Sequence, residues 1–229
     1  MSKEKKPLGA RSETREWVES ILVALLLAVI IRSYLIQPFK IPSGSMRMTL
    51  VEGDHLFVSK YSYGPMLLPE LHTPDFLLGK LQFLGSDPNP DKIQWPEFVK
   101  PLTKIRLPGI SKPKRGDVIV FIYPNDRTKD FIKRLIGLPG DVVEIKEGKI
   151  YINGELFNNP MVKNIYYYNR GEYGALDTPV RIPEGKYFVL GDNSSSSHDS
   201  RYWGFVDQTD LLGKAEFIFW PFNRVRIIK

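Results

Sequence analysis

The pattern of apolar and polar positions begins with one long apolar stretch near the N-terminus. Residues 21–31 are apolar without interruption, and extending the stretch to residues 17–36 gives about 20 residues, or about 30 Å of helix, enough to cross a bilayer. The extension includes Glu19 and Arg32, which lie toward its ends, where charged side chains reach the headgroup region. The pattern therefore predicts a single transmembrane helix over residues 17–36.

Basic residues are denser before this stretch than directly after it. Those that precede it are Lys3, Lys5, Lys6, Arg11 and Arg15, whereas those that follow closely are Lys40 and Arg47. The positive-inside rule then places residues 1–16 in the cytoplasm and residues 37–229 on the extracytoplasmic side. A cleaved secretory signal is the alternative, but Gln37-Pro-Phe-Lys-Ile41 stands where a small-x-small cleavage site would be. We expect an uncleaved signal anchor that crosses the inner (cytoplasmic) membrane once.

The remainder of the chain alternates in a way that is typical of β-strands. Runs rich in Val, Ile, Phe and Tyr predict strands over 117–123, 131–136, 142–146, 149–153, 186–190 and 215–220, with Glu147-Gly148 as a hairpin turn. The 18 glycines and 18 prolines favour many turns. We expect a mostly β fold, in which residues 37–229 form an antiparallel β-sheet domain.

Residues 65–113 break this regularity, because they are rich in proline and aperiodic. They predict an irregular lobe inserted into the β-domain. Within it, residues 76–84 are expected to form a short helix with Thr73 as its N-cap and Pro74 at its first position. This helix is too short to cross a bilayer.

The amino-acid composition argues against several classes of partner and site. The net charge of +6 is dispersed along the chain and no nucleic-acid motif is present, so nucleic acid is not an expected partner. The absence of cysteine excludes disulfides, thiolate metal sites and a cysteine nucleophile. The histidines His55, His72 and His198 show no metal-ligand spacing, so neither a metal nor another cofactor is expected.

A candidate nucleophile follows the anchor closely. Ser45 lies in Ile41-Pro-Ser-Gly-Ser-Met46, nine residues after Ile36, so an extended chain keeps it within about 30 Å of the helix end. A serine hydroxyl needs a base, and the His198-Asp199 pair suggests a triad. However, adjacent residues of an extended chain point to opposite sides, which leaves Asp199 poorly placed to orient His198.

Lysine is the other candidate base, because a neutral amine accepts a proton once burial has lowered its pKa. Strand alternation in residues 131–136 puts Phe131 and Leu135 on the face of Lys133 and Arg134 on the other face. This predicts an apolar setting for Lys133. An edge-strand lysine with its amine in water remains open from this segment alone.

Four segments resemble those of the bacterial type I signal peptidases, the leader peptidases that use a Ser-Lys dyad. They are residues 41–46, 115–124, 131–141 and 191–204, in the family's order, and the anchor and its predicted direction match as well. The resemblance implies a membrane-bound serine endopeptidase that removes N-terminal signal peptides from exported preproteins.

The resemblance also implies roles for individual residues. Ser45 matches the nucleophile, Lys133 the general base, and the hydroxyl of Ser43 with the backbone N–H of Ser45 the oxyanion hole. Ser197 matches the serine that orients the lysine amine, and Asp199 and Arg201 match a supporting ion pair. Residues that line shallow substrate pockets are matched by Phe39, Ile41 and Ile132. From the residues alone, the alternative for Ser43 is simple turn capping. Strict alternation places Ile132 across the strand from Lys133.

The implied partners are preproteins with small residues at the cleavage site, the lipid bilayer and the protein translocation machinery. Met48 departs from the family pattern, which commonly has proline at this position. Two alternatives stay open: a membrane-anchored β-domain that binds partners without catalysis, and a peptidase dedicated to one secretion or pilus substrate. The repressor autoproteases share the dyad, but they carry a DNA-binding domain where this chain has an anchor.

Overall fold

The structure is a computed structural model of the whole chain, and it describes residues 13–67, 102 and 105–228. The helix expected over residues 76–84 and most of the expected lobe lie outside the described residues. The same holds for residues 1–12, which precede the first helix.

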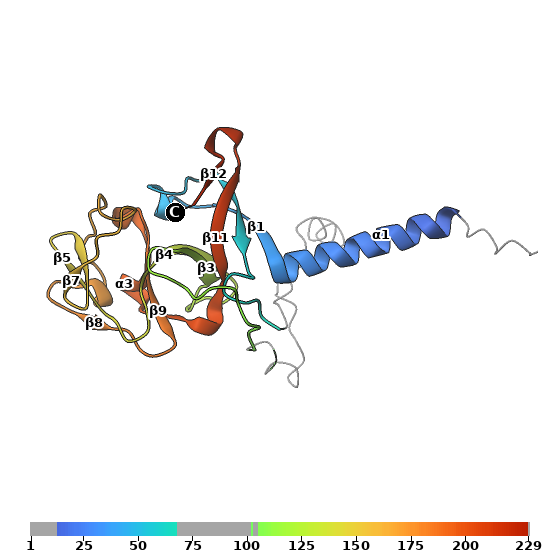
Figure 1. Cartoon of the computed structure of the whole chain (residues 1–229). Helices are drawn as coiled ribbons and strands as arrows, with labels where there is room; N and C mark the ends of the chain where they lie inside the picture. Colours follow the sequence, from blue (N-terminus) through green and yellow to red (C-terminus); the bar gives the residue numbers. More distant parts are fainter. Residues whose placement is uncertain (1–12, 68–101, 103–104, 229) are drawn as a thin grey trace, which may run out of the picture.

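A long helix begins the described chain and projects away from the β-structure (Figure 1). Helix α1 spans Glu13–Ile30 and continues into a π-helical segment, η1, over Ile31–Leu35. Together they form a helical span of 23 residues, within which a window of 18 residues has a mean hydropathy of 2.1, so the span is long and apolar enough to cross a membrane. The helix begins before residue 17, since Arg15 and Glu19 pair at 2.8 Å one turn apart. It ends one residue earlier than expected, because Ile36 already belongs to a strand.

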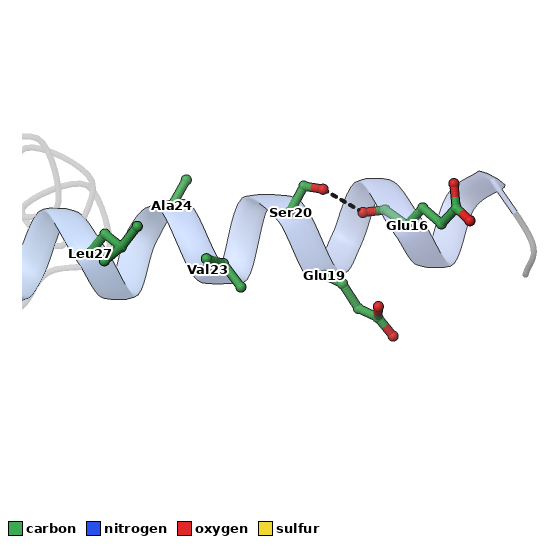
Figure 2. Close-up of a pocket in the computed structure, with 6 residues that line it drawn as sticks. All are labelled: Glu16, Glu19, Ser20, Val23, Ala24 and Leu27. Carbon is green, nitrogen blue, oxygen red and sulfur yellow. Dashed lines mark hydrogen bonds between the residues drawn. The ribbon is translucent and has the colours of Figure 1, made fainter.

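A shallow recess lies along one face of α1 (Figure 2). The described residues that line it are Glu16, Glu19, Ser20, Val23, Ala24 and Leu27. All come from successive turns of one helix, and the Ser20 hydroxyl donates to the Glu16 carbonyl at 2.8 Å. The recess is therefore a helix face outside the β-domain that holds Ser45.

Two antiparallel sheets, with the short helix α3 (Ser200–Trp203) and several 3₁₀ turns, form the rest of the described chain, which confirms the expected mostly β fold. The order of the larger sheet is β1-β2-β11-β3-β4-β9-β10, with β12 beside β11. Its strands are β1 (Ile36–Lys40), β2 (His55–Ser59), β3 (Val118–Ile122), β4 (Asp130–Gly137), β9 (Lys186–Leu190), β10 (Val206–Asp207), β11 (Leu211–Trp220) and β12 (Arg226–Ile227). The smaller sheet has the order β7-β6-β5-β8, from Glu155–Leu156, Lys149–Ile152, Val142–Lys146 and Val180–Arg181.

The predicted strands are present, β4 and β11 are longer than predicted, and six short strands were not predicted, namely β1, β2, β7, β8, β10 and β12. The hairpin of β5 and β6 turns at Glu147 and Gly148, which both have positive φ (49° and 73°), as a two-residue hairpin turn requires. Strand β11 begins at Leu211 instead of residue 215, because Gly213 lets it pass close to the Ser59 backbone. The alternation did not predict β1 or β2, whose short segments follow the apolar helix.

Curling of the large sheet brings distant strands to one hydrophobic cluster. Ile41, which directly follows β1, belongs to the same buried cluster as Val118 and Val120 of β3, and Ile132 of β4 packs against it. Three strands separate β1 from β4 in the sheet order, so a flat sheet would keep these residues apart. The curl therefore carries the segment after β1 across to β4.

Candidate active site

Ser45 lies in a tight turn that the core holds in place. The turn is the 3₁₀ segment η2, Gly44–Met46, and the Met46 and Leu50 side chains beside it are fully buried. The amides of Thr49 and Leu50 donate to the Met46 carbonyl at 2.8 and 2.6 Å. Ser45 itself is 9% exposed. The sequence thus places a nearly buried hydroxyl on a turn that is anchored on both sides.

Lys133 comes from β4 and reaches this hydroxyl. Its Nζ lies 2.7 Å from Ser45 Oγ and 3.0 Å from the Ile132 carbonyl, and 5.3 Å from the centre of the Phe131 ring. Lys133 is only 4% exposed, so the alternative of a lysine with its amine in water is wrong. Phe131 and Leu135 share one hydrophobic cluster while Ile132 packs against another, as strand alternation predicts.

Burial changes the acid–base chemistry of this amine. It lowers the pKa of Lys133 from 10.5 to about 8, against the opposing pull of the Asp199 and Asp192 carboxylates. A substantial share of the amine is then neutral at mildly alkaline pH. A neutral amine 2.7 Å from a serine hydroxyl can accept its proton.

His198 and Asp199 do not form a triad with Ser45 in the described structure. His198 is exposed, and its Nε2 lies 3.1 Å from the Tyr123 hydroxyl. The Asp199 carboxylate accepts from the Arg201 side chain and from the Gly191 N–H. The histidine is therefore a surface residue in an aromatic group, and the aspartate is paired elsewhere.

Ser43 precedes the turn and is exposed. It occupies the N-cap position of η2, yet its side chain makes no capping hydrogen bond. The turn-cap explanation of Ser43 is therefore wrong. Ser43 thus presents an exposed hydroxyl two residues before Ser45.

Ser197 lies beside Ser45 but makes no hydrogen bond to the lysine amine. Its hydroxyl is buried and has no hydrogen-bond partner among the described residues, while Lys133 Nζ bonds to Ser45 Oγ and the Ile132 carbonyl instead. A Cβ on Gly191 would lie 2.1 Å from Ser197 Oγ and 2.6 Å from the Ser45 carbonyl oxygen. Glycine at position 191 thus lets the two serine segments pack side by side.

Asp199 and Arg201 form a fully buried ion pair at 2.8 Å. Arg201 also donates to the Ser194 hydroxyl and carbonyl and to the Tyr168 carbonyl, each at 2.9 Å. Since a buried guanidinium needs such partners, the arrangement fixes the loop that carries Ser197. The structure thereby brings together the two residues expected to pair.

A second buried ion pair was missing from the sequence prediction. Arg134 and Asp192, both fully buried, pair at 2.6 Å, and Arg134 also donates to the Thr49 hydroxyl at 3.0 Å. The Thr49 hydroxyl in turn donates to Asp192. An arginine in the middle of an apolar strand signals the need for a buried partner. Alternation put Arg134 opposite Lys133, but nothing in the sequence pattern selected Asp192.

The predicted pocket residues also converge. Ile41 is buried, and Phe39 and Ile132 are partly buried against the same cluster, next to the Ser45 turn. Strand β1, which carries Phe39, is an edge of the large sheet among the described residues. No group of His, Asp or Glu residues in the described ranges could hold a metal ion.

The chain is similar in sequence to one family of known proteins. The family described as signal peptidase, peptidase S26, matches residues 14–220. A signal peptidase I of Bacillus licheniformis is 32% identical, with 97% of each chain covered. A signal peptidase I of Pseudomonas aeruginosa is also 32% identical, over 93% of this chain and 78% of its own. A crystal structure of a signal peptidase I from Enterococcus faecalis V583 matches 46% of this chain and 98% of that one, at 39% identity and a TM-score of 0.39.

Proposed function

This chain belongs to the signal peptidase family S26, serine endopeptidases that remove signal peptides, and we propose that it cleaves exported preproteins with a Ser45–Lys133 dyad at the membrane surface. The single observation that carries the dyad is the 2.7 Å contact between the buried Lys133 amine and the Ser45 hydroxyl.

The chemistry follows from that contact. Neutral Lys133 takes the Ser45 proton as Oγ attacks the carbonyl carbon of the scissile bond. The Ser43 hydroxyl and the Ser45 N–H donate to the oxyanion that forms, which is where hydrogen bonds lower the barrier most. The Lys133 ammonium then gives its proton to the leaving amine. Water, deprotonated by the same lysine, hydrolyses the acyl-enzyme and frees Ser45.

Positioning of Lys133 rests on its neighbours. The Ile132 carbonyl accepts from the amine and the Asp199–Arg201 pair orders the loop beside it. We assign Ser197 the orienting role that the family resemblance implies. Its buried hydroxyl lies beside the Ser45 backbone and has no hydrogen-bond partner among the described residues, which leaves it able to bond to the lysine amine in the reacting enzyme.

Substrate binds, in this proposal, as an added strand along β1. The Ile41 N–H donates to the Asp54 carbonyl, and the Lys60 N–H donates to the Leu35 carbonyl. The backbone N–H and C=O groups of the odd-numbered residues in this segment therefore point toward β2, and those of the even-numbered residues point away from it. The outward positions are Pro38, Lys40 and Pro42. Strand addition there gives backbone hydrogen bonds, while Phe39, Ile41 and Ile132 select small side chains near the scissile bond.

Location at the membrane surface has two supports besides the apolar helix. The π-helical segment passes directly into β1, which leads to Ser45 within a few residues. Apolar side chains near the Ser45 turn are also exposed, namely Met48, Trp220, Phe222 and Ile227. Arg226 donates to the Thr49 carbonyl, which ties the β11–β12 tip to that turn. We propose that α1 crosses the inner membrane with its N-terminus in the cytoplasm, beside the translocation machinery that delivers preproteins.

The test is cleavage of a preprotein with an Ala-x-Ala site in detergent. We expect the unmodified chain and His198→Ala to cut, and Ser45→Ala and Lys133→Ala to be inactive. Loss in Ser45→Ala and His198→Ala, with Lys133→Ala still active, would restore the triad. An unmodified chain that cuts no general preprotein would favour the non-catalytic binding domain or the dedicated peptidase, which a panel of secretion and pilus substrates separates.

A further inference from the structure

Asn193 makes two hydrogen bonds to the turn that carries Ser45. Its backbone N–H donates to the Ser45 carbonyl, and its side-chain Nδ2 donates to the Gly44 carbonyl, both at 2.9 Å. The orientation of the carboxamide is fixed chemically, because a carbonyl oxygen only accepts. The Oδ1 atom on the other side accepts from the Ser195 hydroxyl at 3.2 Å.

The bond to Gly44 acts on the peptide unit that contains the Ser45 N–H. The Gly44 carbonyl and the Ser45 N–H belong to one planar group and point in opposite directions. A donor that fixes the carbonyl oxygen on one side therefore fixes the direction of the N–H on the other side. Hydrogen bonding at the carbonyl also polarises the group, which strengthens the N–H as a donor.

Asn193, which we call a clamp because it bonds to the Gly44 and Ser45 carbonyls, is itself held in place by its neighbours. Asn193 follows Asp192, which is fully buried against Arg134, and Asp192 follows Gly191, whose N–H donates to Asp199. The Asn193 carbonyl accepts from the Ser196 N–H at 3.0 Å. The Gly44 carbonyl also accepts from the Arg47 N–H at 3.1 Å within the turn. Asn193 thus adds a fixed point at the Gly44 carbonyl, in addition to the hydrogen bond within the turn and the burial of Met46 in the core.

We propose that Asn193 is a positioning residue that aims the Ser45 N–H at the oxyanion. It touches neither the substrate nor the Ser45 hydroxyl, and it acts through the Gly44–Ser45 peptide unit. The inference rests on the proposed function, since it assigns the Ser45 N–H to the oxyanion hole. It predicts an effect on the transition state and little effect on substrate binding.

The experiment compares the unmodified full-length chain with Asn193→Asp and Asn193→Ala, in detergent, on an Ala-x-Ala preprotein. Asp keeps the size of the side chain but cannot donate to Gly44, and Ala removes the donor without adding charge. The matched control is Asn169→Asp, because Asn169 Nδ2 donates to two backbone carbonyls, of Ile145 and Gly174, away from the Ser45 turn. Each variant is measured for kcat, KM, inhibition by a peptide aldehyde ending in alanine, and Tm.

We expect kcat of both Asn193 variants to fall about 10-fold, with KM nearly unchanged. This fall is smaller than that caused by removing an oxyanion-hole donor, because the Ser45 N–H remains. Inhibition by the aldehyde, whose adduct carries the same oxyanion, should weaken by the same factor. Asn169→Asp should lower Tm but keep kcat.

An inactive unmodified chain would overturn the proposed function, and the inference with it. An active unmodified chain whose Asn193 variants keep kcat would overturn the inference alone. An equal loss of kcat in Asn169→Asp would do the same, since it would show a general effect of an altered fold. If Asn193→Asp does not fold, Asn193→Ala decides by the same criteria.

Discussion

At the residue scale, burial of one amine connects the fold to the proposed chemistry. Strand β4 directs Lys133 into a space that Phe131 and the Ser45 turn close, so the charged form loses hydration that the neutral form does not need. Asp199 and Asp192 are close enough to favour the charged form, yet burial outweighs them. The lysine is therefore suited to accept a proton, at some expense of stability.

The pH dependence of cleavage should follow the Lys133 amine. Because its pKa is about 8 and only the neutral form accepts the Ser45 proton, kcat should rise through a midpoint near pH 8 and stay high in mildly alkaline solution. Single-turnover cleavage of a preprotein between pH 6 and 10 measures this. A flat profile under conditions where chemistry limits the rate would contradict it.

Replacing the amine should stabilise the protein while abolishing activity. At pH 7 the folded state holds a buried charge, so Lys133→Met should raise the free energy of unfolding by up to about 3 kcal/mol. The lowered pKa means that the folded state binds fewer protons between pH 8 and 10.5, so the unmodified chain gains stability with rising pH in that window. The advantage of the variant should therefore shrink toward pH 10.5.

Urea unfolding in detergent at pH 7 and pH 10.5 measures this difference. The exposed Lys163 provides the control, since Lys163→Met should change stability little at either pH. An Lys133→Met protein less stable than the unmodified chain at pH 7 would show that the amine contributes more through its hydrogen bonds than burial costs.

At the element scale, one buried ion pair joins the loop over residues 191–201 to the sheet, and a second holds the loop itself together. Arg134 reaches from β4 to Asp192, and Arg201 pairs with Asp199 within the loop. Asp192 and Asn193 also contact the Ser45 segment, through the Thr49 hydroxyl and the Gly44 and Ser45 carbonyls. These ion pairs and hydrogen bonds therefore hold the Ser45 turn, β4 and this loop in fixed positions relative to one another.

Removal of Asp192 should show how much the stability of the protein depends on the buried Arg134–Asp192 pair. Asp192→Ala leaves the fully buried Arg134 guanidinium without its carboxylate, which should cost about 3 to 5 kcal/mol of stability. The solvent-accessible pair of Asp126 with Lys129 is the control, and Asp126→Ala should cost much less stability than Asp192→Ala. Urea midpoints compare the two; similar losses would mean that the buried pair is not a structural requirement.

At the scale of the whole molecule, a helix that can cross a membrane leads directly into the sheet that presents Ser45. Figure 1 shows α1 extending away from the two sheets, with β1 at their junction. This connection limits how far the Ser45 turn can lie from the end of the span. It also fixes which side of the bilayer the turn occupies once the direction of the helix is known.

The direction of α1 can be measured with introduced cysteines, because the chain has none of its own. We expect a membrane-impermeant maleimide to label Glu155→Cys, on an exposed position of β7, from the extracytoplasmic side of sealed vesicles. Ser2→Cys, ahead of the span, should react only after the membrane is opened. The reverse pattern would place the β-domain in the cytoplasm and contradict the proposed topology.

Local patterns predicted much of the fold and some of the site. Alternation around Lys133 correctly separated Phe131 and Leu135 from Ile132, and Glu147-Gly148 correctly marked a hairpin. The partner of Arg134 could not be predicted, because pairing across the fold depends on which loop the curled sheet brings near. The same reason hid the Asn193 clamp, which lies about 150 positions along the chain from the turn that it holds.

The sequence by itself determined the apolar helix, the mostly β class and the residue types needed for a serine and lysine pair, because periodicity and residue chemistry are local properties. Only the tertiary structure decided that the Lys133 amine is buried and meets Ser45, that Asp192 pairs with Arg134, and that Ser197 lies beside the turn without bonding to the amine. These outcomes depend on the curl of one sheet, which buries and aligns groups that are far apart along the chain.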